Sequence, residues 1–428
     1  MNLISVLCIR VMAAMFAVAL ASSESAAQAT PPTPEPPSPS VDTGYVDYDG
    51  AVSFPLGIGF RLPSYNRVDG LVIPWGPFIS LSAGKVNIDP TLTYRSDIGK
   101  IDPFVRGHFR LSDRDEIEIG AGRSTITNDD WIRSDLINSA AVLFVGSDAR
   151  NYFRADRAVA RYSRRITRTD YTIIPSVGAL TEKAWSTGSP IAHSAAPFSV
   201  LGRNDSLKML RPNPAVSRGR ISSALGRVDV GYERELTTFD FDTRIEVGFD
   251  GPSESLRVDI ARGGSPQCAG ARACTGVASG IVGNFTQLTF GSKAAFPTFG
   301  TQRFAFRGHA VVTPGNDAPP QRFAYLGGAG TLATVDLLAL GGDNLLYVEG
   351  EYTIPLTRPV LPFVGSPILS ARYAAGGAEV GGMPDLVQNI GVGIGVRLLK
   401  AEYHIDPNYR KTSFSKKSAF SLGVSLTL

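Results

Sequence analysis

The stretch FSLGVSLTL, at residues 420–428, decides the class of fold. Large apolar residues occupy every second position, and small or polar residues occupy the positions between them. Because successive side chains of a β-strand point to opposite faces, this stretch predicts a strand with one apolar and one polar face. The apolar set is Phe420, Leu422, Val424, Leu426 and Leu428.

The same alternation recurs along the chain, for example at 116–119, 227–233, 241–249, 256–260 and 303–312. Phe241, Ile245 and Phe249 alternate with charged residues such as Arg244 and Glu246. Several such segments run for about ten residues, the length that crosses a bilayer at a tilt, whereas strands of soluble sandwiches are nearer five or six. The pattern therefore favours membrane-crossing strands.

A sheet in lipid must pair every backbone group, so a multi-stranded sheet that crosses a membrane has to close on itself. We count about sixteen candidate strands, and at roughly twenty-four residues per strand with its connection they account for residues 42–428. The predicted fold is an all-β, transmembrane antiparallel β-barrel of about sixteen strands, with about fourteen as the alternative.

The N-terminus is typical of an exported protein. Arg10 precedes an apolar run from Val11 to Ala21, and Ala27-Gln28-Ala29 is a suitable cleavage site. Residues 1–29 are therefore predicted to be a signal peptide. Residues 30–41 are rich in proline and are predicted to be an extended spacer, so that the barrel comprises 42–428.

One segment departs from the strand pattern. After the group Thr127-Asn128-Asp129-Asp130, which is rich in N-cap residues, apolar residues recur at helical spacing until Gly146. This predicts a short amphipathic helix from about Trp131 to Val145. The helix could plug the lumen, lie on the periplasmic rim or lie at the membrane interface.

The charge of the chain gives no sign of nucleic-acid binding, because the net charge is only +3 and basic and acidic residues are interspersed. The cysteines predict one disulfide. After loss of the signal peptide two cysteines remain, Cys268 and Cys274. We predict a disulfide between them, because a metal site would need two further ligands and no other Cys or His lies nearby.

Arginines are dense between residues 150 and 168. As a strand, the segment would place Arg157, Arg161 and Arg165 on one side, and this basic patch of the lumen would favour anions. Alternatively, these are charges that any wet interior carries. A third alternative is a helix, in which Arg150, Arg154, Arg157, Arg161, Arg164 and Arg168 would form one stripe.

No catalytic motif is present. The sequence has no G-x-S-x-G, no H-E-x-x-H and no phosphate-binding glycine loop, and its four histidines are scattered. We therefore predict that the protein is not an enzyme and has no catalytic, cofactor-binding or metal-binding residues. A membrane-embedded hydrolase would require His, Asp and Ser clustered at the extracellular rim.

The stretch QRFAYLGGAGTLATVDLLALGGDNLLYVEGEYTIPL, at 321–356, resembles a segment of the bacterial surface antigen superfamily, the BamA-type outer-membrane barrels that insert or translocate proteins. The family pattern is an aromatic-Leu-Gly-Gly, a Leu-Arg-Gly-aromatic turn, a Gly-Gly-Asn/Asp and a Glu-Tyr-Arg-x-Pro-Leu strand. The residues that match its polar and glycine positions are Gly327, Gly328, Gly341, Gly342, Asp343 and Glu351.

The Arg-Gly-aromatic triplet has no match, since Leu332 is followed by Ala333, Thr334 and Val335. In the family that arginine lies on a loop folded into the lumen and pairs with strand carboxylates, which braces the barrel. A second resemblance is to members of the superfamily that lack POTRA domains. It rests on Tyr65-Asn66-Arg67-Val68-Asp69-Gly70, Asp135-Leu136-Ile137-Asn138-Ser139 and Asp148-Ala149-Arg150-Asn151-Tyr152.

These resemblances imply an integral barrel of the bacterial outer membrane that acts in protein or lipid translocation or in membrane assembly. The implied partners are outer-membrane lipid, the barrel-insertion machinery for its own assembly and periplasmic partner proteins, with no nucleic acid and no cofactor. The alternative is a passive pore with a basic lumen for small anionic solutes.

Overall fold

Alternating apolar and polar residues form long antiparallel strands in the computed structural model of this chain. The structure describes residues 52–187, 211, 213–217, 219–249, 258–259, 277–278, 284–315, 317–356, 366–396 and 399–424. The signal peptide and the spacer predicted from sequence, and the predicted Cys268–Cys274 disulfide, lie outside these residues.

The main sheet contains nineteen strand segments, joined by antiparallel ladders. They are β1 (Val52–Ser53), β2 (Ser64–Asn66), β3 (Gly70–Trp75), β4 (Phe78–Leu81), β5 (Val86–Arg95), β6 (Lys100–Arg110), β7 (Asp115–Ile126), β8 (Phe153–Arg164), β9 (Ile166–Thr167), β10 (Tyr171–Ser186), β11 (Gly219–Arg234), β12 (Thr237–Phe249), β15 (Phe285–Pro297), β16 (Arg303–Val312), β19 (Asn344–Pro355), β20 (Pro367–Glu379), β21 (Val387–Val396), β22 (Leu399–Ile405) and β23 (Ser418–Val424).

Two small hairpins and a few helical turns complete the described elements. The hairpins are β13 (Val258–Asp259) with β14 (Val277–Ala278), and β17 (Ala324–Leu326) with β18 (Leu340–Gly342). The helical elements are η1 (Pro55–Gly57), α2 (Asp135–Ala140), the π-turn η2 (Ala141–Val145) and η4 (Pro320–Arg322). Among the residues that the structure describes, no helix is long and apolar enough to cross a membrane.

The segments of the main sheet make up sixteen strands, as the sequence predicts. β1 and β2 are two pieces of a first strand, which pair with β4 and β3, and β3 and β4 in turn pair with the two halves of β5. From β5 onward each strand pairs with the next along the chain, up to β23. Among the described residues no ladder joins the first strand to β23.

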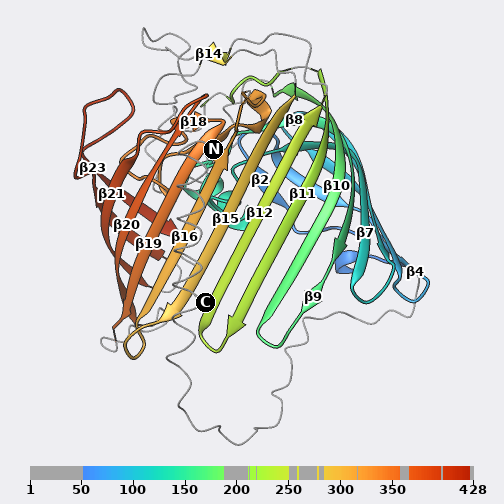
Figure 1. Cartoon of the computed structure of the whole chain (residues 1–428), viewed down its shortest axis with the longest axis horizontal. Coiled ribbons are helices and arrows are strands. Elements are labelled where there is room, and N and C mark those ends of the chain that lie inside the picture. Colours follow the sequence, from blue (N-terminus) through green and yellow to red (C-terminus); the bar gives the residue numbers. More distant parts are fainter. Residues whose placement is uncertain are drawn as a thin grey trace, which may run out of the picture. The chain divides into compact units, whose positions relative to one another are not determined.

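The sheet is strongly curled. The Tyr65 backbone N–H of β2 donates to Ser139 Oγ of α2, and Arg133, just before α2, donates to the Ala329 carbonyl. The segment after Ala329 then reaches the β22–β23 connection, where the Asp336 N–H donates to the Phe414 carbonyl at 2.8 Å. Sixteen flat strands at about 4.8 Å spacing would put their first and last members roughly 70 Å apart. The helix α2 and the segment 329–336 can connect the first and last strands only because the sheet bends around (Figure 1).

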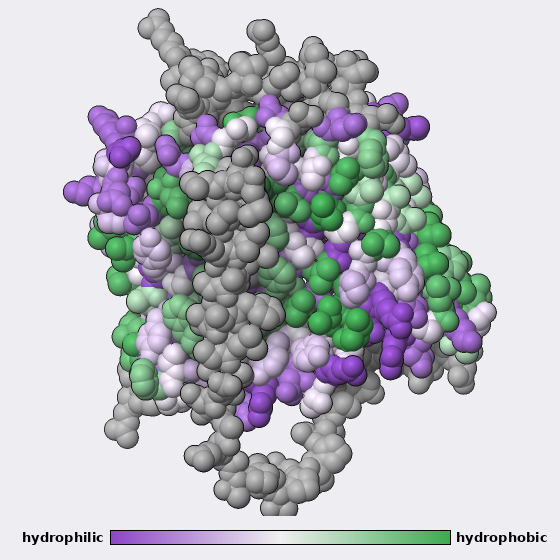
Figure 2. Space-filling model, in the orientation of Figure 1, coloured by the Kyte–Doolittle hydropathy of each residue, from purple (hydrophilic) through white to green (hydrophobic). Residues whose placement is uncertain are grey.

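The outward face of the sheet carries its large apolar side chains. In β21, Ile390, Val392 and Ile394 are 50%, 60% and 51% exposed, whereas the alternate residue Asn389 is 1% exposed on the inward face. Phe420 and Leu422 are likewise exposed in β23, while Ser421 faces inward and contacts His404. Figure 2 shows hydrophobic residues spread over the visible outward face.

The helix between β7 and β8 is shorter than the sequence predicts and begins later. Ser134, not the earlier Thr127–Asp130 group, is the N-cap of α2, and its Oγ accepts from the Ile137 N–H. The element ends at Gly146 in the left-handed conformation, as predicted. Its packing differs, since Leu136 is exposed and the buried face consists of Asn138, Ser139 and Val142.

The two ends of the strands differ. One end carries short turns, at 82–85, 111–114, 235–236 and 298–302. The opposite end carries the long connections, at 127–152, 187–218, 250–284, 313–343 and 406–417. Because antiparallel strands alternate in direction, these five connections lie at the same end, while 356–366 lies at the end that carries the short turns.

Candidate functional site

Two of the long connections fold into the space that the sheet encloses and pack against each other. We call residues 127–152 and 317–343 the plug. The Asn128 side-chain amide donates to the carbonyls of Gln321 and Phe323 at 2.7 and 3.1 Å. Trp131 stacks on the inward-facing His309 of β16, with ring centroids 4.2 Å apart. The plug is therefore one packed unit that touches the inner wall.

The wall beside the plug carries a group of paired charges, the Glu349 cluster. Glu349 of β19 accepts from Arg307 of β16 and from Arg372 of β20, each at 2.7 Å, and the Tyr347 hydroxyl donates to the same carboxylate. Arg372 is only 7% exposed. A charge so far from water is stable only when it is paired, so each member of this cluster requires the others.

The two arginines of the Glu349 cluster also hold the plug. Arg372 Nη2 donates to the Thr331 carbonyl at 2.9 Å, and Arg307 Nη2 donates to the Gly330 carbonyl. The resemblance implies a loop arginine on strand carboxylates. Here the guanidinium groups belong to the strands and the loop offers its backbone carbonyls, so the direction of the contact is reversed.

At the position of the missing triplet the loop has other partners. The Thr334 N–H donates to Asn389 Oδ1 at 3.0 Å, and Asn389 Nδ2 donates back to Thr334 Oγ1 at 2.7 Å. Asn389 belongs to β21, so the reciprocal pair ties the loop to the wall. An uncharged pair therefore occupies the place of the family's Arg-Gly-aromatic motif.

A second charged group holds the other end of the plug. Arg322 of η4 donates to Glu182 of β10 at 2.9 Å and to Glu246 of β12 at 3.0 Å. Burial alone disfavours the charge on Arg322, but the two carboxylates raise its pKa above the ordinary value. At Arg322, unlike at Thr331, the arginine belongs to the plug and the carboxylates belong to the wall.

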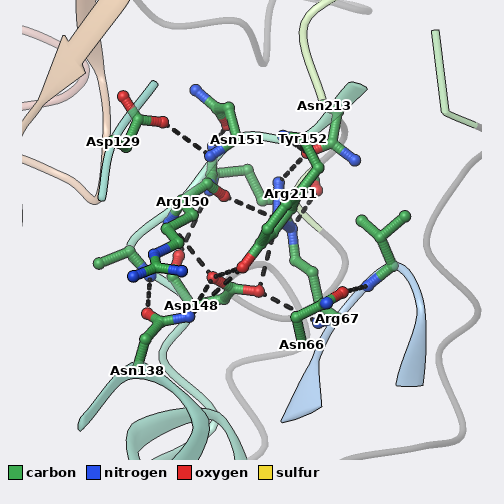
Figure 3. A network of polar contacts seen from close by, with 12 residues as sticks. Asn66, Arg67, Asp129, Asn138, Asp148, Arg150, Asn151, Tyr152, Arg211 and Asn213 are labelled. Atoms are coloured by element: carbon green, nitrogen blue, oxygen red, sulfur yellow. Dashed lines mark hydrogen bonds and ion pairs between the residues drawn. The ribbon is translucent and has the colours of Figure 1, made fainter. Parts of the chain in front are cut away.

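The three motifs of the second resemblance meet in one buried network, shown in Figure 3. The Arg67 N–H donates to Asp148 Oδ2 at 3.1 Å, and Asn138 Nδ2 donates to Asp148 Oδ1 at 3.1 Å. Arg67 and Arg211 both donate to the Arg150 carbonyl at 2.9 Å. The network joins the β2–β3 turn to the plug and fixes how the first strands meet it.

Asp129 links the two halves of the plug. Its Oδ2 accepts from the Asn151 N–H at 2.8 Å and its Oδ1 from the Tyr325 N–H at 3.2 Å. Burial raises the pKa of Asp129 from 3.8 to about 7, more than these hydrogen bonds and nearby Arg211 lower it. The plug therefore contains a carboxyl group that changes charge near neutral pH.

The glycines identified from sequence lie together in the plug. Gly327 and Gly328 follow β17 with φ of +127° and +82°, and a Cβ on Gly327 would lie 2.3 Å from the Asp336 carbonyl. A Cβ on Gly341 would lie 2.3 Å from the Tyr325 ring, and one on Gly342 would lie 2.1 Å from the Glu379 carbonyl. These positions need glycine because other chain segments approach too closely for a side chain.

Asp343 lies with these glycines, but Glu351 does not. Buried Asp343 accepts from the N–H groups of Gly381 and Ala318 at 2.9 and 3.1 Å, and burial raises its pKa. Glu351 lies farther along β19 and pairs with Lys400 of β22. The structure thus brings five of the six motif residues together and leaves Glu351 to brace the wall.

The arginines of the expected basic patch lie on or beside β8, so the strand interpretation of this segment is confirmed and the helical one is wrong. Arg157 pairs with Glu182, and Arg161 pairs with Glu118. Arg165 follows the end of β8 and is exposed. Two of the three charges are therefore already matched by carboxylates.

Sequence reasoning missed Glu349 and Arg322, and it gave Asp148 only as part of a motif, without its role as an acceptor for Arg67 and Asn138. A signal existed for Glu349, because it occupies an inward position of its strand and lies directly opposite Arg307 in the ladder. No local pattern points to Arg322, which is 140 residues from Glu182 along the chain.

The class that this fold and site define is an antiparallel sheet curled around an internal, charge-held plug. No protein-family model matches the chain, and no curated protein matches it.

Solved structures match over most of the chain. CdiB from Escherichia coli is similar at 12% identity and a TM-score of 0.45, over 86% of this chain and 61% of that one. CdiB from Acinetobacter baumannii is similar at 10% identity and a TM-score of 0.46, over 88% of this chain and 60% of that one. BamA from Haemophilus ducreyi lacking POTRA domains 1–3 is similar at 10% identity and a TM-score of 0.48, over 85% of this chain and 69% of that one. The chain spans about three fifths of the length of the two CdiB chains.

We predict that Glu349→Gln strongly destabilises the folded protein. Two largely buried arginines would lose their shared carboxylate, and breaking a buried pair typically costs about 3–5 kcal/mol. Circular dichroism during thermal unfolding in detergent measures the effect. Glu351→Gln is the matched control, since it removes the same charge two residues along β19 but leaves its partner Lys400 paired with Glu402 at 3.0 Å, so we expect a smaller loss. Equal losses in the two variants would contradict a special role for Glu349.

We predict that Asp129 makes the protein less stable as pH rises from about 4 to about 7. Because its folded-state pKa is raised, the folded state binds the proton more tightly than the unfolded state, so stability falls across this window and is flat above it. The loss is on the order of a few kcal/mol. Urea unfolding at several pH values, compared with Asp129→Asn, isolates this group. Parallel pH profiles for both proteins would rule the effect out.

Proposed function

We propose that this chain is an outer-membrane β-barrel of the BamA-type superfamily that acts in protein or lipid translocation or in outer-membrane assembly, with its lumen closed by the plug. The observation that carries the proposal is the loop with the family's glycine motif, which is folded inside the sheet and held there by Arg307 and Arg372. Its activity, clients and periplasmic partners belong to the proposal.

The outward face supports a membrane location. Large apolar side chains alternate with inward polar ones in strand after strand, and exposed apolar surface on this scale is unfavourable in water. In lipid it is the favoured arrangement, and the short turns and long connections fit the periplasmic and extracellular ends of such barrels.

The plug supports a role other than free diffusion of solutes. A passive anion pore would need an open path lined by unmatched basic groups. Arg157 and Arg161 are each paired with a carboxylate. The Glu349 cluster ties the plug to β16, β19 and β20, and Arg322 ties it to β10 and β12. We therefore place translocation or assembly ahead of the anion pore.

A membrane-embedded hydrolase has weaker support. Ser421 Oγ lies 3.2 Å from His404 Nε2, and Glu402 lies 3.8 Å from the same nitrogen. A catalytic relay needs the carboxylate on the other ring nitrogen from the nucleophile. The described residues also hold no cluster of metal ligands.

We predict that Val392→Arg greatly reduces the folded fraction, whereas Leu236→Arg is tolerated. Both side chains are exposed, but Val392 lies at the middle of β21 and Leu236 in a short turn. An arginine at the midplane of a lipid-facing strand costs about 2–4 kcal/mol and little near the interface. The boiling-dependent shift on an SDS gel measures folding. If both variants fold equally, the outward face does not contact lipid.

Planar-bilayer conductance separates translocation or assembly from a passive pore. We expect the wild-type protein to conduct little and a variant lacking 329–336, the segment held by the Glu349 cluster, to conduct steadily. A wild-type protein with steady anion-selective conductance would favour the pore.

A further inference from the structure

A groove of about 580 Å³ opens on the outward face, where β3 to β7 lie side by side. Its walls include the exposed side chains of Trp75, Leu92 and Val105. Three prolines from neighbouring strand positions, Pro77, Pro90 and Pro103, line it as well. The lining is apolar, so the groove suits a hydrocarbon occupant.

The sheet itself opens at this groove. The ladder between β6 and β7 ends at Phe104↔Gly122, so residues 100–103 of β6 have no partner on β7. Gly122 has a φ of +152°, and a Cβ there would lie 2.4 Å from the Pro103 carbonyl. Proline supplies no backbone donor for a ladder. The groove is therefore built into the strand pairing and does not depend on one side-chain rotamer.

A row of charged residues lies on the outward face directly beyond the groove. The ladders place Arg123 of β7, Asp156 of β8 and Lys183 of β10 side by side. Arg123 Nε and Nη2 donate to Asp156 at 2.7 and 3.0 Å, and its guanidinium lies 5.3 Å from the Trp185 ring. Lys183 is exposed and has no ion pair among the described residues, so the row carries a net positive charge.

The groove and the row together fit one kind of molecule. Arg123 follows Gly122, a lining residue, and it lies toward the end of β7 that carries the long connections. We propose that this site binds a phosphate-bearing lipid of the leaflet on that side, with an acyl chain in the groove and the phosphate on Lys183 and Arg123. The inference rests on the proposed membrane location and adds a specific lipid site to it.

The test uses fluorescence of the full chain in lipid vesicles. Trp75 lines the groove and reports on it. The parent protein is the Trp185→Phe variant, which removes the tryptophan beside Arg123. Quenching that disappears when Trp75→Phe is added to this parent belongs to Trp75. The probes are phosphatidic acid and phosphatidylcholine with brominated acyl chains, at equal mole fractions in unlabelled phosphatidylcholine. We expect phosphatidic acid to reach half-maximal quenching of Trp75 at a concentration lower by about fivefold, the contribution of one basic side chain near anionic lipid.

Variants separate the headgroup from the groove. Lys183→Gln should remove most of the preference, whereas Arg164→Gln, at the opposite end of β8 on the same face, should keep it. Ala121→Phe, which fills the groove, should reduce quenching by both lipids. Equal quenching by both lipids, or a preference that survives Lys183→Gln, would overturn the lipid site and leave the membrane location standing. Absence of quenching by either lipid, together with no shift on boiling, would overturn both.

Discussion

The interior of this protein depends on the carboxylate of Glu349. Two wall arginines, Arg307 and Arg372, can remain in a poorly hydrated space only because they share that carboxylate. The Nη2 atoms that donate to Glu349 also donate to the carbonyls of Gly330 and Thr331. The loop therefore needs no charge of its own. The segment around Ala333 is braced without a loop arginine, because Arg307 and Arg372 of the wall supply the cations there, whereas Arg322 supplies one from the plug at β10 and β12.

The strands could be predicted from sequence because their cause is local. Period-two alternation reports which face each side chain occupies, and residues such as Ile245 and Glu246 fall on the faces that their chemistry indicates. The helix was predicted less well. Asp129 has the chemistry of an N-cap, but tertiary contacts with Asn151 and Tyr325 use its carboxylate instead, and the helix begins only after Ser134.

The site could be predicted only in part. Glycines at 327, 328, 341 and 342 were recognisable from a pattern, and the structure gives the physical reason, which is close approach of other chain segments. The pairing of Arg322 with Glu182 and Glu246 was not recognisable, since nothing in a strand's own pattern reports which distant connection will enter the lumen. Likewise, Arg67 and Asp148 each belong to a quoted motif, but only the folded chain reveals that the motifs touch.

The plug also has a consequence for how the chain folds. Its two halves are joined by hydrogen bonds between residues 193 to 196 positions apart, such as Asn128 with Gln321 and Arg133 with Ala329. Neighbouring strands, in contrast, are linked mostly through short connections. Closing so long a segment costs more entropy than forming a hairpin, and contacts of wide sequence separation form slowly. The strand meander can therefore propagate hairpin by hairpin. The plug is complete only once residues 317–343 have packed against 127–152, so we expect it to form late in folding.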